Sequence, residues 1–201
     1  EAMVYGIEQW DDLLPLFEKA SVCLIGPGLG DDVWGKELFY RVLGSHLPMV
    51  IDASALRILG ASPQYDDNWV LTPHPGEAAS LLHCTTTEVQ QNRCDALCQL
   101  CQQYGGTIVL KGVGSLIGTD KNQTYICDGG NPGMASPGMG DALSGVIAGL
   151  IAQGLSLPEA AKLGVYVHAR AGDLAVQQQG ERGLLASDLL PFVRKLVNQK
   201  K

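Results

Sequence analysis

Strand-length apolar runs that alternate with helical segments are the feature that most constrains how this 201-residue chain can fold. The runs are rich in β-branched residues and bounded by turn residues, which predicts strands at 21–26, 48–53, 68–74 and 106–112. Their near-continuous hydrophobicity is typical of strands that are covered on both faces. Amphipathic helices are predicted between them, at 32–43, 76–83 and 86–104. This alternation predicts an α/β fold with a mostly parallel central sheet and helices on both faces.

The remaining sequence adds a hairpin and a helical C-terminal part. Two runs, 114–119 and 123–129, predict a β-hairpin that turns at 120–122. Thr85 and Glu88 form a capping box before the helix at 86–104. Beyond Asp141, helices are predicted near 141–153, 158–179 and 187–198. We find no repeat, low-complexity tract or linker, so residues 1–201 are predicted to form a single domain.

Charge and hydropathy argue against nucleic acid and membranes as partners. The chain has 21 acidic and 14 basic side chains, a net charge of −7, and its basic residues are scattered. It therefore has no electrostatic footprint for nucleic acid. No apolar run reaches the length that spans a bilayer. The most apolar stretch, 143–155, is interrupted by Ser144 and Gln153, and we interpret it as a buried helix.

Three of the six cysteines share one face of a predicted helix. Cys94, Cys98 and Cys101 are spaced four and three residues apart and alternate with Leu97 and Leu100. A zinc site would need two close ligand pairs. We therefore predict that the three cysteines are buried as small apolar side chains and bind no metal. Because the sequence opens without a secretory segment, we expect reduced thiols in the cytoplasm.

The unusual residues follow the predicted strands, where open parallel sheets bind ligands. These strand-end loops lie at 26–30, 52–55, 72–77 and 111–115. In the first loop, the motif "GPGLG" with Gly28 and Gly30 could present its backbone to a ligand or form a tight strand-to-helix turn. It lacks the ending of a P-loop and the spacing of a dinucleotide fingerprint. Taken alone, it favours the turn.

The next strand ends carry a histidine and a lysine. His74 lies between two prolines that restrict its direction, and Glu77 follows at a helix start. A lone histidine is usually structural, but one stiffened at the end of a strand indicates a functional position. Glu77 could simply favour the helix N-terminus. Lys111, beside Gly112 and Gly114, is either an exposed turn lysine or a contact to a nucleotide.

A loop rich in glycine and proline changes directly into a helical pattern at Asp141. The free amides and dipole of a helix N-terminus attract anions, and glycines let a phosphate approach closely. A carboxylate beside such a cradle is suited to taking a proton from a hydroxyl that attacks phosphorus. Alternatively, Asp141 is only an N-cap. The local pattern supports the two interpretations equally.

Together, the motifs "GPGLG", "TPHPGE", "LKGVGSLI" and "NPGMASPGMGDALSG" closely resemble those of the ADP-dependent NAD(P)H-hydrate dehydratase family, over about residues 21–153. The resemblance implies a ribokinase-like fold. It also implies dehydration of the hydrated, redox-inactive form of NADH or NADPH, driven by ADP in bacterial members and by ATP in eukaryotic ones. The hydrate hydroxyl would be phosphorylated and then eliminated as phosphate. We expect Mg²⁺ to neutralise the nucleotide phosphates, with few ligands from the protein.

The resemblance also implies roles for individual residues. Asp141 would be the catalytic general base, and amides of the loop before it would stabilise the phosphate in transfer. ADP would be bound by Lys111, Gly112, Val113, Gly114, Ser115, Asn131, Pro132, Gly133, Met134, Ala135, Ser136, Pro137, Gly138, Met139 and Gly140. The hydrated dinucleotide would be bound by Gly28, Gly30, His74, Pro75, Gly76, Glu77 and Asp141.

The sequence departs from the family at its beginning. Family domains carry further N-terminal strand and helix segments, often preceded by an epimerase domain, so we expect residues 1–201 to lack the N-terminal segment of the dehydratase domain. We also expect a homo-oligomer. Two alternatives remain: a ribokinase-like kinase that phosphorylates a vitamin-precursor alcohol with ATP, and a nucleotide-binding fragment without catalysis.

Overall fold

A six-stranded sheet forms the centre of the computed structural model, which describes residues 3–119 and 123–198. The strands lie in sequence order: β1 (Cys23–Ile25), β2 (Met49–Ile51), β3 (Trp69–Leu71), β4 (Thr107–Leu110), β5 (Ser115–Thr119) and β6 (Thr124–Cys127). The first four are parallel, and β5 and β6 add an antiparallel hairpin. The predicted sheet and hairpin are confirmed, while the turn at 120–122 lies outside the described residues.

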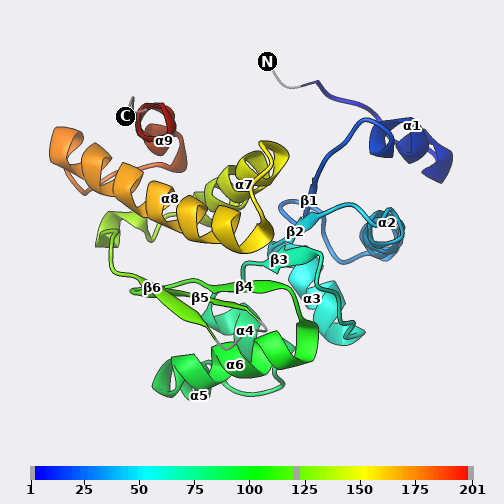
Figure 1. The fold of residues 1–201 in the computed structure, drawn as a ribbon, viewed down its shortest axis with the longest axis horizontal. Helices are drawn as coiled ribbons and strands as arrows, with labels where there is room; N and C mark the ends of the chain where they lie inside the picture. Colours follow the sequence, from blue (N-terminus) through cyan, green and yellow to red (C-terminus); the bar gives the residue numbers. More distant parts are fainter. Residues whose placement is uncertain (1–2, 120–122, 199–201) are drawn as a thin grey trace.

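Helices cover both faces of the sheet (Figure 1). One face carries α2 (Val33–Leu43), α3 (Ala53–Ala61), α4 (Pro75–Leu81), α5 (Thr86–Gln91) and α6 (Arg93–Tyr104). The other carries α7 (Met139–Ala152) and α8 (Leu157–Gln179), with α9 (Ala186–Val197) packed on α8. Short helical turns lie at η1 (Trp10–Leu13), α1 (Leu14–Phe17) and η2 (Pro132–Met134).

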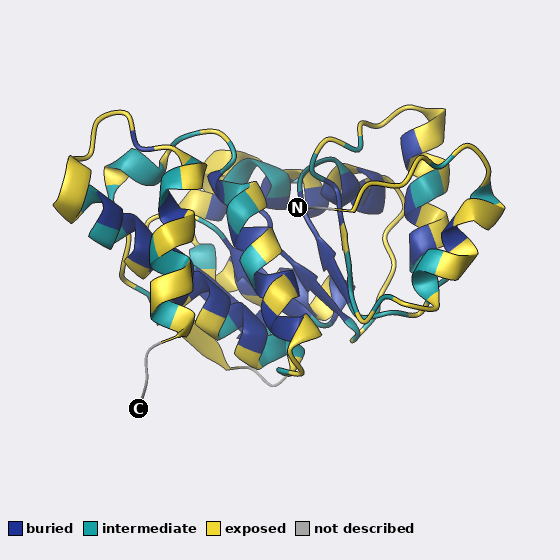
Figure 2. Cartoon of the chain, turned by 90° about the horizontal axis from the view of Figure 1, so that it is seen from above, coloured by how far each residue is buried: buried dark blue, intermediate teal, exposed yellow. Residues whose placement is uncertain are grey.

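Strand β2 shows why the apolar runs are continuous. Met49 and Ile51 face the core under α2–α6, whereas Val50 faces the core under α7 and α8. Successive side chains of a strand point to opposite faces, so both sets must be apolar. Figure 2 shows the buried residues along the sheet and on the inner sides of the helices. In the described part of the chain, no helix is long and apolar enough to cross a membrane.

Two helix predictions need correction. Helix α3 was not predicted, because β2 ends at Ile51 and Asp52 caps a helix that starts at Ala53, inside the range predicted as strand. The predicted helix at 86–104 is two helices, α5 and α6, separated by Asn92 with φ −135° and ψ 58°. The capping box of Thr85 and Glu88 is confirmed.

The prediction of a buried cysteine face is wrong for two of its three members. Cys101 is buried, but Cys94 and Cys98 are exposed. The buried face of α6 is centred on Leu97 and Leu100, which continue the core beneath the sheet. Cys94 lies in the first turn of α6, and Cys98 lies beside that face, so both thiols remain on the surface.

Candidate active site

The parallel strands bring the predicted loops to one edge of the sheet. Ile25, Ile51 and Leu71 are register partners, so the residues that follow β1, β2 and β3 emerge side by side. Lys111 follows β4 at the same edge, and its amide donates to the carbonyl of Pro73. Ligands of such sheets bind at this edge.

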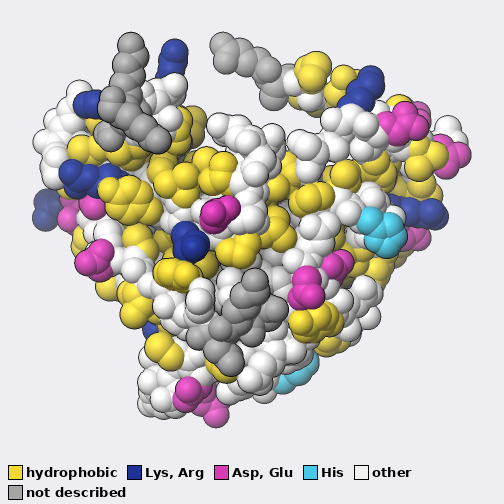
Figure 3. Space-filling view, in the orientation of Figure 1, with side chains coloured by type: hydrophobic (Ala, Val, Ile, Leu, Met, Phe, Trp, Pro, Cys, Tyr) yellow, Lys and Arg dark blue, Asp and Glu magenta, His cyan; other side chains and the backbone are white. Residues whose placement is uncertain are grey.

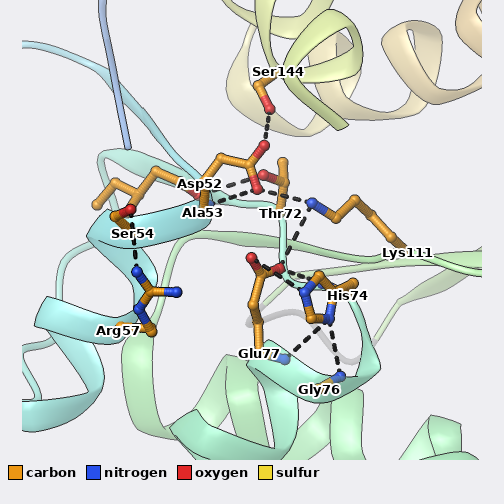
Figure 4. Close-up of polar contacts among 11 residues, drawn as sticks. Asp52, Ala53, Ser54, Arg57, Thr72, His74, Gly76, Glu77, Lys111 and Ser144 are labelled. Carbon is orange, nitrogen blue, oxygen red and sulfur yellow. Dashed lines mark hydrogen bonds and ion pairs between the residues drawn. The ribbon is translucent and has the colours of Figure 1, made fainter. Parts of the chain in front are cut away.

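Lys111 joins two carboxylates at this edge (Figure 4). Its Nζ lies 2.8 Å from Oδ1 of Asp52 and 3.7 Å from Oε2 of Glu77. The Asp52 side chain is 1% exposed and that of Lys111 is 17% exposed. Burial alone would raise the pKa of Asp52, but the Lys111 ammonium and the hydrogen bonds from Ser144 and the Ala53 amide together lower it below 3.8. Asp52 is therefore a buried carboxylate held ionised by a cation.

Asp52 also connects this edge to the start of α7. The hydroxyl of Ser144 donates to Oδ2 of Asp52 and lies 2.8 Å from the carbonyl oxygen of Gly140. A Cβ placed on Gly140 would lie 3.1 Å from Nζ of Lys111. The lysine ammonium and the N-terminus of α7 are thus direct neighbours, and both attract anions.

Asp141 lies in the first turn of α7. The N-cap of this helix is Gly138, which has φ 85° and no side chain that could cap. Asp141 is exposed and follows Gly140 directly. The interpretation of Asp141 as the N-cap is therefore wrong, and the carboxylate stands next to the amides that begin the helix.

Helix α8 and the segment after it hold the loop before α7 in place. Asp173 accepts hydrogen bonds from the amide of Gly130 at 3.2 Å and from Nδ2 of Asn131 at 3.1 Å. Ser136 Oγ lies 2.9 Å from the carbonyl oxygen of Leu184. His168 is buried behind the loop and hydrogen bonds to the backbone of Met139. Its burial, together with the charge of Lys111, lowers the pKa of His168 to about 4.

The loop with Gly28 and Gly30 passes over the Asp52 segment. Both glycines have positive φ, 70° and 75°, as a tight turn between β1 and α2 requires. A Cβ on Gly26 would overlap the carbonyl oxygen of Asp52, so a side chain there would push the loop away. The turn that the sequence favoured is present, and its first residue, Gly26, lies against the backbone of Asp52.

His74 has a capping role that sequence reasoning did not assign to it. Its Nδ1 accepts hydrogen bonds from the amides of Gly76 and Glu77, while Glu77 accepts one from the amide of His74. The ring remains 56% exposed, with Nε2 3.5 Å from Oε1 of Glu77. The Nε2 side of the imidazole therefore faces both Glu77 and solvent.

Four of the predicted site residues are brought into contact at this edge. His74, Glu77 and Lys111 form one connected cluster, and Gly140 adjoins it through Lys111 and Ser144. Asp141 is the next residue along the chain. Asp52 was not predicted as a site residue. Its loop at 52–55 stood out as a strand end, but the side chain has its partners 59 and 92 residues away in the sequence.

Two further features lie outside the cluster around Lys111. Val113 is fully exposed at the tip of the loop at 111–115. A cavity of about 370 Å³ lies away from the cluster, between α6 and the ends of β5 and β6, lined by Leu97, Cys98 and Gly118 among others. In the described part of the chain, no group of three or more His, Cys, Asp or Glu side chains could hold a metal ion.

Curated relatives match almost the whole chain. The chain is 51% identical over 198 residues to the bifunctional NAD(P)H-hydrate repair enzyme Nnr of Coxiella burnetii, covering 98% of this chain and 41% of the relative. It is 36% identical to the ADP-dependent (S)-NAD(P)H-hydrate dehydratase of Neisseria meningitidis, covering 94% of this chain and 67% of the relative. The chain thus spans about two fifths of the length of the bifunctional relative.

Solved structures agree on the fold. The ADP/ATP-dependent NAD(P)H-hydrate dehydratase of Bacillus subtilis, co-crystallised with ATP and Mg²⁺, superposes with a TM-score of 0.80 at 28% identity, covering 88% of this chain and 64% of that one. Arabidopsis thaliana ribokinase superposes with a TM-score of 0.60 at 18% identity, covering 92% and 59%, which confirms the ribokinase-like fold. A family model described as NAD(P)H-hydrate dehydratase matches residues 1–194. The chain therefore belongs to the NAD(P)H-hydrate dehydratase family.

Proposed function

We propose that this chain catalyses the ADP-dependent dehydration of hydrated NADH and NADPH, which restores the reduced nicotinamide. The observation that carries the proposal is the position of Asp141, an exposed carboxylate that directly follows Gly140 at the N-terminus of α7. Gly140 in turn lies against the ammonium of Lys111. An anion site and a free carboxylate side by side are what phosphoryl transfer to a hydroxyl requires.

The reaction has two steps that balance. Asp141 takes the proton of the hydrate hydroxyl while the hydroxyl oxygen attacks the β-phosphorus of ADP. The bond from that phosphorus to the AMP oxygen breaks. The phosphorylated hydrate then loses phosphate as its C–O bond breaks and the neighbouring carbon loses a proton. NAD(P)H, AMP and phosphate result. General-base catalysis of this kind contributes about 10²–10⁴-fold, and the amides of Gly138, Met139 and Gly140 stabilise the charge of the transferring phosphoryl group.

The two ligands would divide the site between them. ADP lies against residues 111–115 and 131–140, whose glycines and helix N-terminus suit phosphates. The hydrated dinucleotide lies against Gly28, Gly30 and the segment 74–77, on the other side of Lys111. This division is supported by the cluster that joins Glu77 to Lys111, because one ammonium then adjoins both ligands.

Mg²⁺ fits this site as a companion of the nucleotide. The carboxylates of Asp52 and Glu77 already face Lys111, whereas Asp141 is exposed. Phosphate oxygens of the nucleotide would thus supply most of the ligands, as is usual for Mg²⁺, and the protein few. When bound, the ion neutralises phosphate charge, a role that the Bacillus subtilis relative, co-crystallised with ATP and Mg²⁺, supports.

We also propose that the protein works as a homo-oligomer in the cytoplasm. Cys23, Cys84, Cys94, Cys98 and Cys127 are free thiols, which is usual in a reducing compartment. Tyr125 and Ile126 on β6 and Tyr166 on α8 are exposed side chains with large apolar groups. Figure 3 shows hydrophobic side chains at many places on the visible face of the molecule. Light scattering should give a multiple of the chain mass, whereas a monomer mass would refute the assembly.

The activity is tested by incubating the purified protein with hydrated NADPH and ADP. We expect the absorbance of the reduced nicotinamide to return, with one AMP and one phosphate released for each molecule restored. A stable phosphorylated alcohol made from ATP would instead identify a ribokinase-like kinase. Nucleotide binding without any turnover of the hydrate would identify a binding module.

A further inference from the structure

Arg93 reaches from the start of α6 to the loop at 111–115, which we call the nucleotide loop. Its Nη1 donates to the carbonyl of Val113 at 3.2 Å. Its Nη2 lies within 3.5 Å of the carbonyl oxygens of Leu110, Lys111 and Gly114. The guanidinium therefore lies close to four carbonyl oxygens of residues 110–114.

The break between α5 and α6 makes this reach possible. Asn92 leaves helical geometry with φ −135° and ψ 58°, so Arg93 begins a new helix rather than continuing α5. A Cβ on Gly112 would lie 2.5 Å from Nη1 of Arg93. The loop therefore approaches the guanidinium so closely that only glycine fits at that position.

The carbonyl directions fix the directions of the amides. In a planar trans peptide the C=O of one residue and the N–H of the next point to opposite sides. Because the carbonyls of Lys111 and Val113 point to Arg93, the amides of Gly112 and Gly114 point away from it. The nucleotide loop thus presents N–H groups on the side opposite the guanidinium, which is the arrangement that binds phosphate or a polar nucleotide atom.

The charge of Arg93 is not neutralised nearby. Among the described residues, no carboxylate forms an ion pair with its guanidinium within 4.0 Å, although ion pairs are found at Arg57 and Lys111. The positive charge therefore stands directly behind the nucleotide loop. Carbonyl dipoles satisfy its hydrogen bonds without cancelling the charge.

We propose that Arg93 is a positioning residue for the nucleotide: it shapes the nucleotide loop so that the amides of Gly112 and Gly114 face ADP, and it adds positive charge behind them. This inference rests on the proposed function for the identity of the ligand. The planar fork of arginine has five donors, whereas lysine offers a single point charge. Arg93→Lys therefore keeps the charge but loses the geometry.

Isothermal calorimetry with ADP and Arg93→Lys tests the inference on the purified protein. Because lysine cannot hold the carbonyls that the guanidinium fork holds, Arg93→Lys should weaken ADP binding by at least about tenfold. The dissociation constant of the dinucleotide should change less than about twofold. Arg194→Lys, at an exposed position in the last turn of α9, is the matched control and should leave both constants unchanged.

A second variant separates positioning from folding. Arg93→Ala leaves a space that free guanidinium ions can fill, and millimolar guanidinium should restore ADP affinity toward that of the wild type. If Arg93 only supported the fold, guanidinium would restore the binding of ADP and of the dinucleotide alike. Unchanged ADP affinity in Arg93→Lys, equal weakening of both ligands, or absence of rescue would each overturn the inference. If Arg93→Lys weakens ADP binding as expected but the wild-type protein does not turn over the hydrate, only the proposed function is overturned.

Discussion

Acidification from pH 8 to pH 5 should weaken the fold through His168. This side chain is 8% exposed, and its burial lowers its pKa from 6.5 to about 4. Between these two pKa values, His168 is therefore protonated in the unfolded chain but mostly neutral in the folded protein. The stabilisation is complete above pH 6.5 and is lost as the pH falls toward 4, because protonation favours the unfolded state over this interval.

The size of the effect follows from the two pKa values. With pKa values of 6.5 and about 4, linkage predicts a loss of about 2 kcal/mol in the free energy of unfolding between pH 8 and pH 5. Urea denaturation at both pH values measures it. His168→Gln removes the titration but keeps an N–H donor for the backbone of Met139, so all other titrating groups cancel in the comparison. Equal losses in the wild type and in His168→Gln would refute the reasoning.

Three further predictions concern the site and the cysteines. Asp52→Asn leaves the Lys111 ammonium with only the Glu77 carboxylate, at 3.7 Å, as a charged partner among the described residues. Thermal denaturation should show a loss of about 3 kcal/mol in the free energy of unfolding, and unchanged stability would contradict the buried ion pair. His74→Ala should weaken binding of the hydrated dinucleotide more than that of ADP, and Gly138→Val should do the reverse, since a β-branched side chain is strained at φ 85°. Calorimetry that finds both variants weakening the same ligand would point to a single extended site. A maleimide should label Cys98 in the native protein and Cys101 only in denaturant, and metal analysis should find no stoichiometric zinc; zinc at one equivalent that disappears in Cys98→Ala would overturn the absence of a metal site.

The fold was predictable where hydrophobic periodicity decides it. Strands such as β2 are buried on both faces, so their signal is a continuous apolar run with clear ends. Helix α3 was missed because Asp52, the residue directly after β2, already caps it, which leaves no turn residues between the strand and the helix. The break at Asn92 carries no proline or glycine, so the local sequence gives no signal for it.

Short motifs marked several of the residues that form the candidate site. Glycine-rich loops, His74, Lys111 and Asp141 stand out because each lies at the end of a strand or the start of a helix. Asp52 and Arg93 did not stand out, since their roles come from partners at least 17 residues away. An aspartate after an apolar strand or an arginine at the start of a helix is ordinary until the chain is folded.

Turnover by Asp141→Asn measures the central claim most directly. Asparagine has nearly the same shape but cannot accept the hydroxyl proton, so the variant should fold normally and bind ADP with wild-type affinity. Restoration of NADPH from its hydrate, followed by absorbance with ADP present, should fall by about 10²–10⁴-fold. Near-normal turnover by this variant, with ADP bound, would contradict the assignment of Asp141 as the general base.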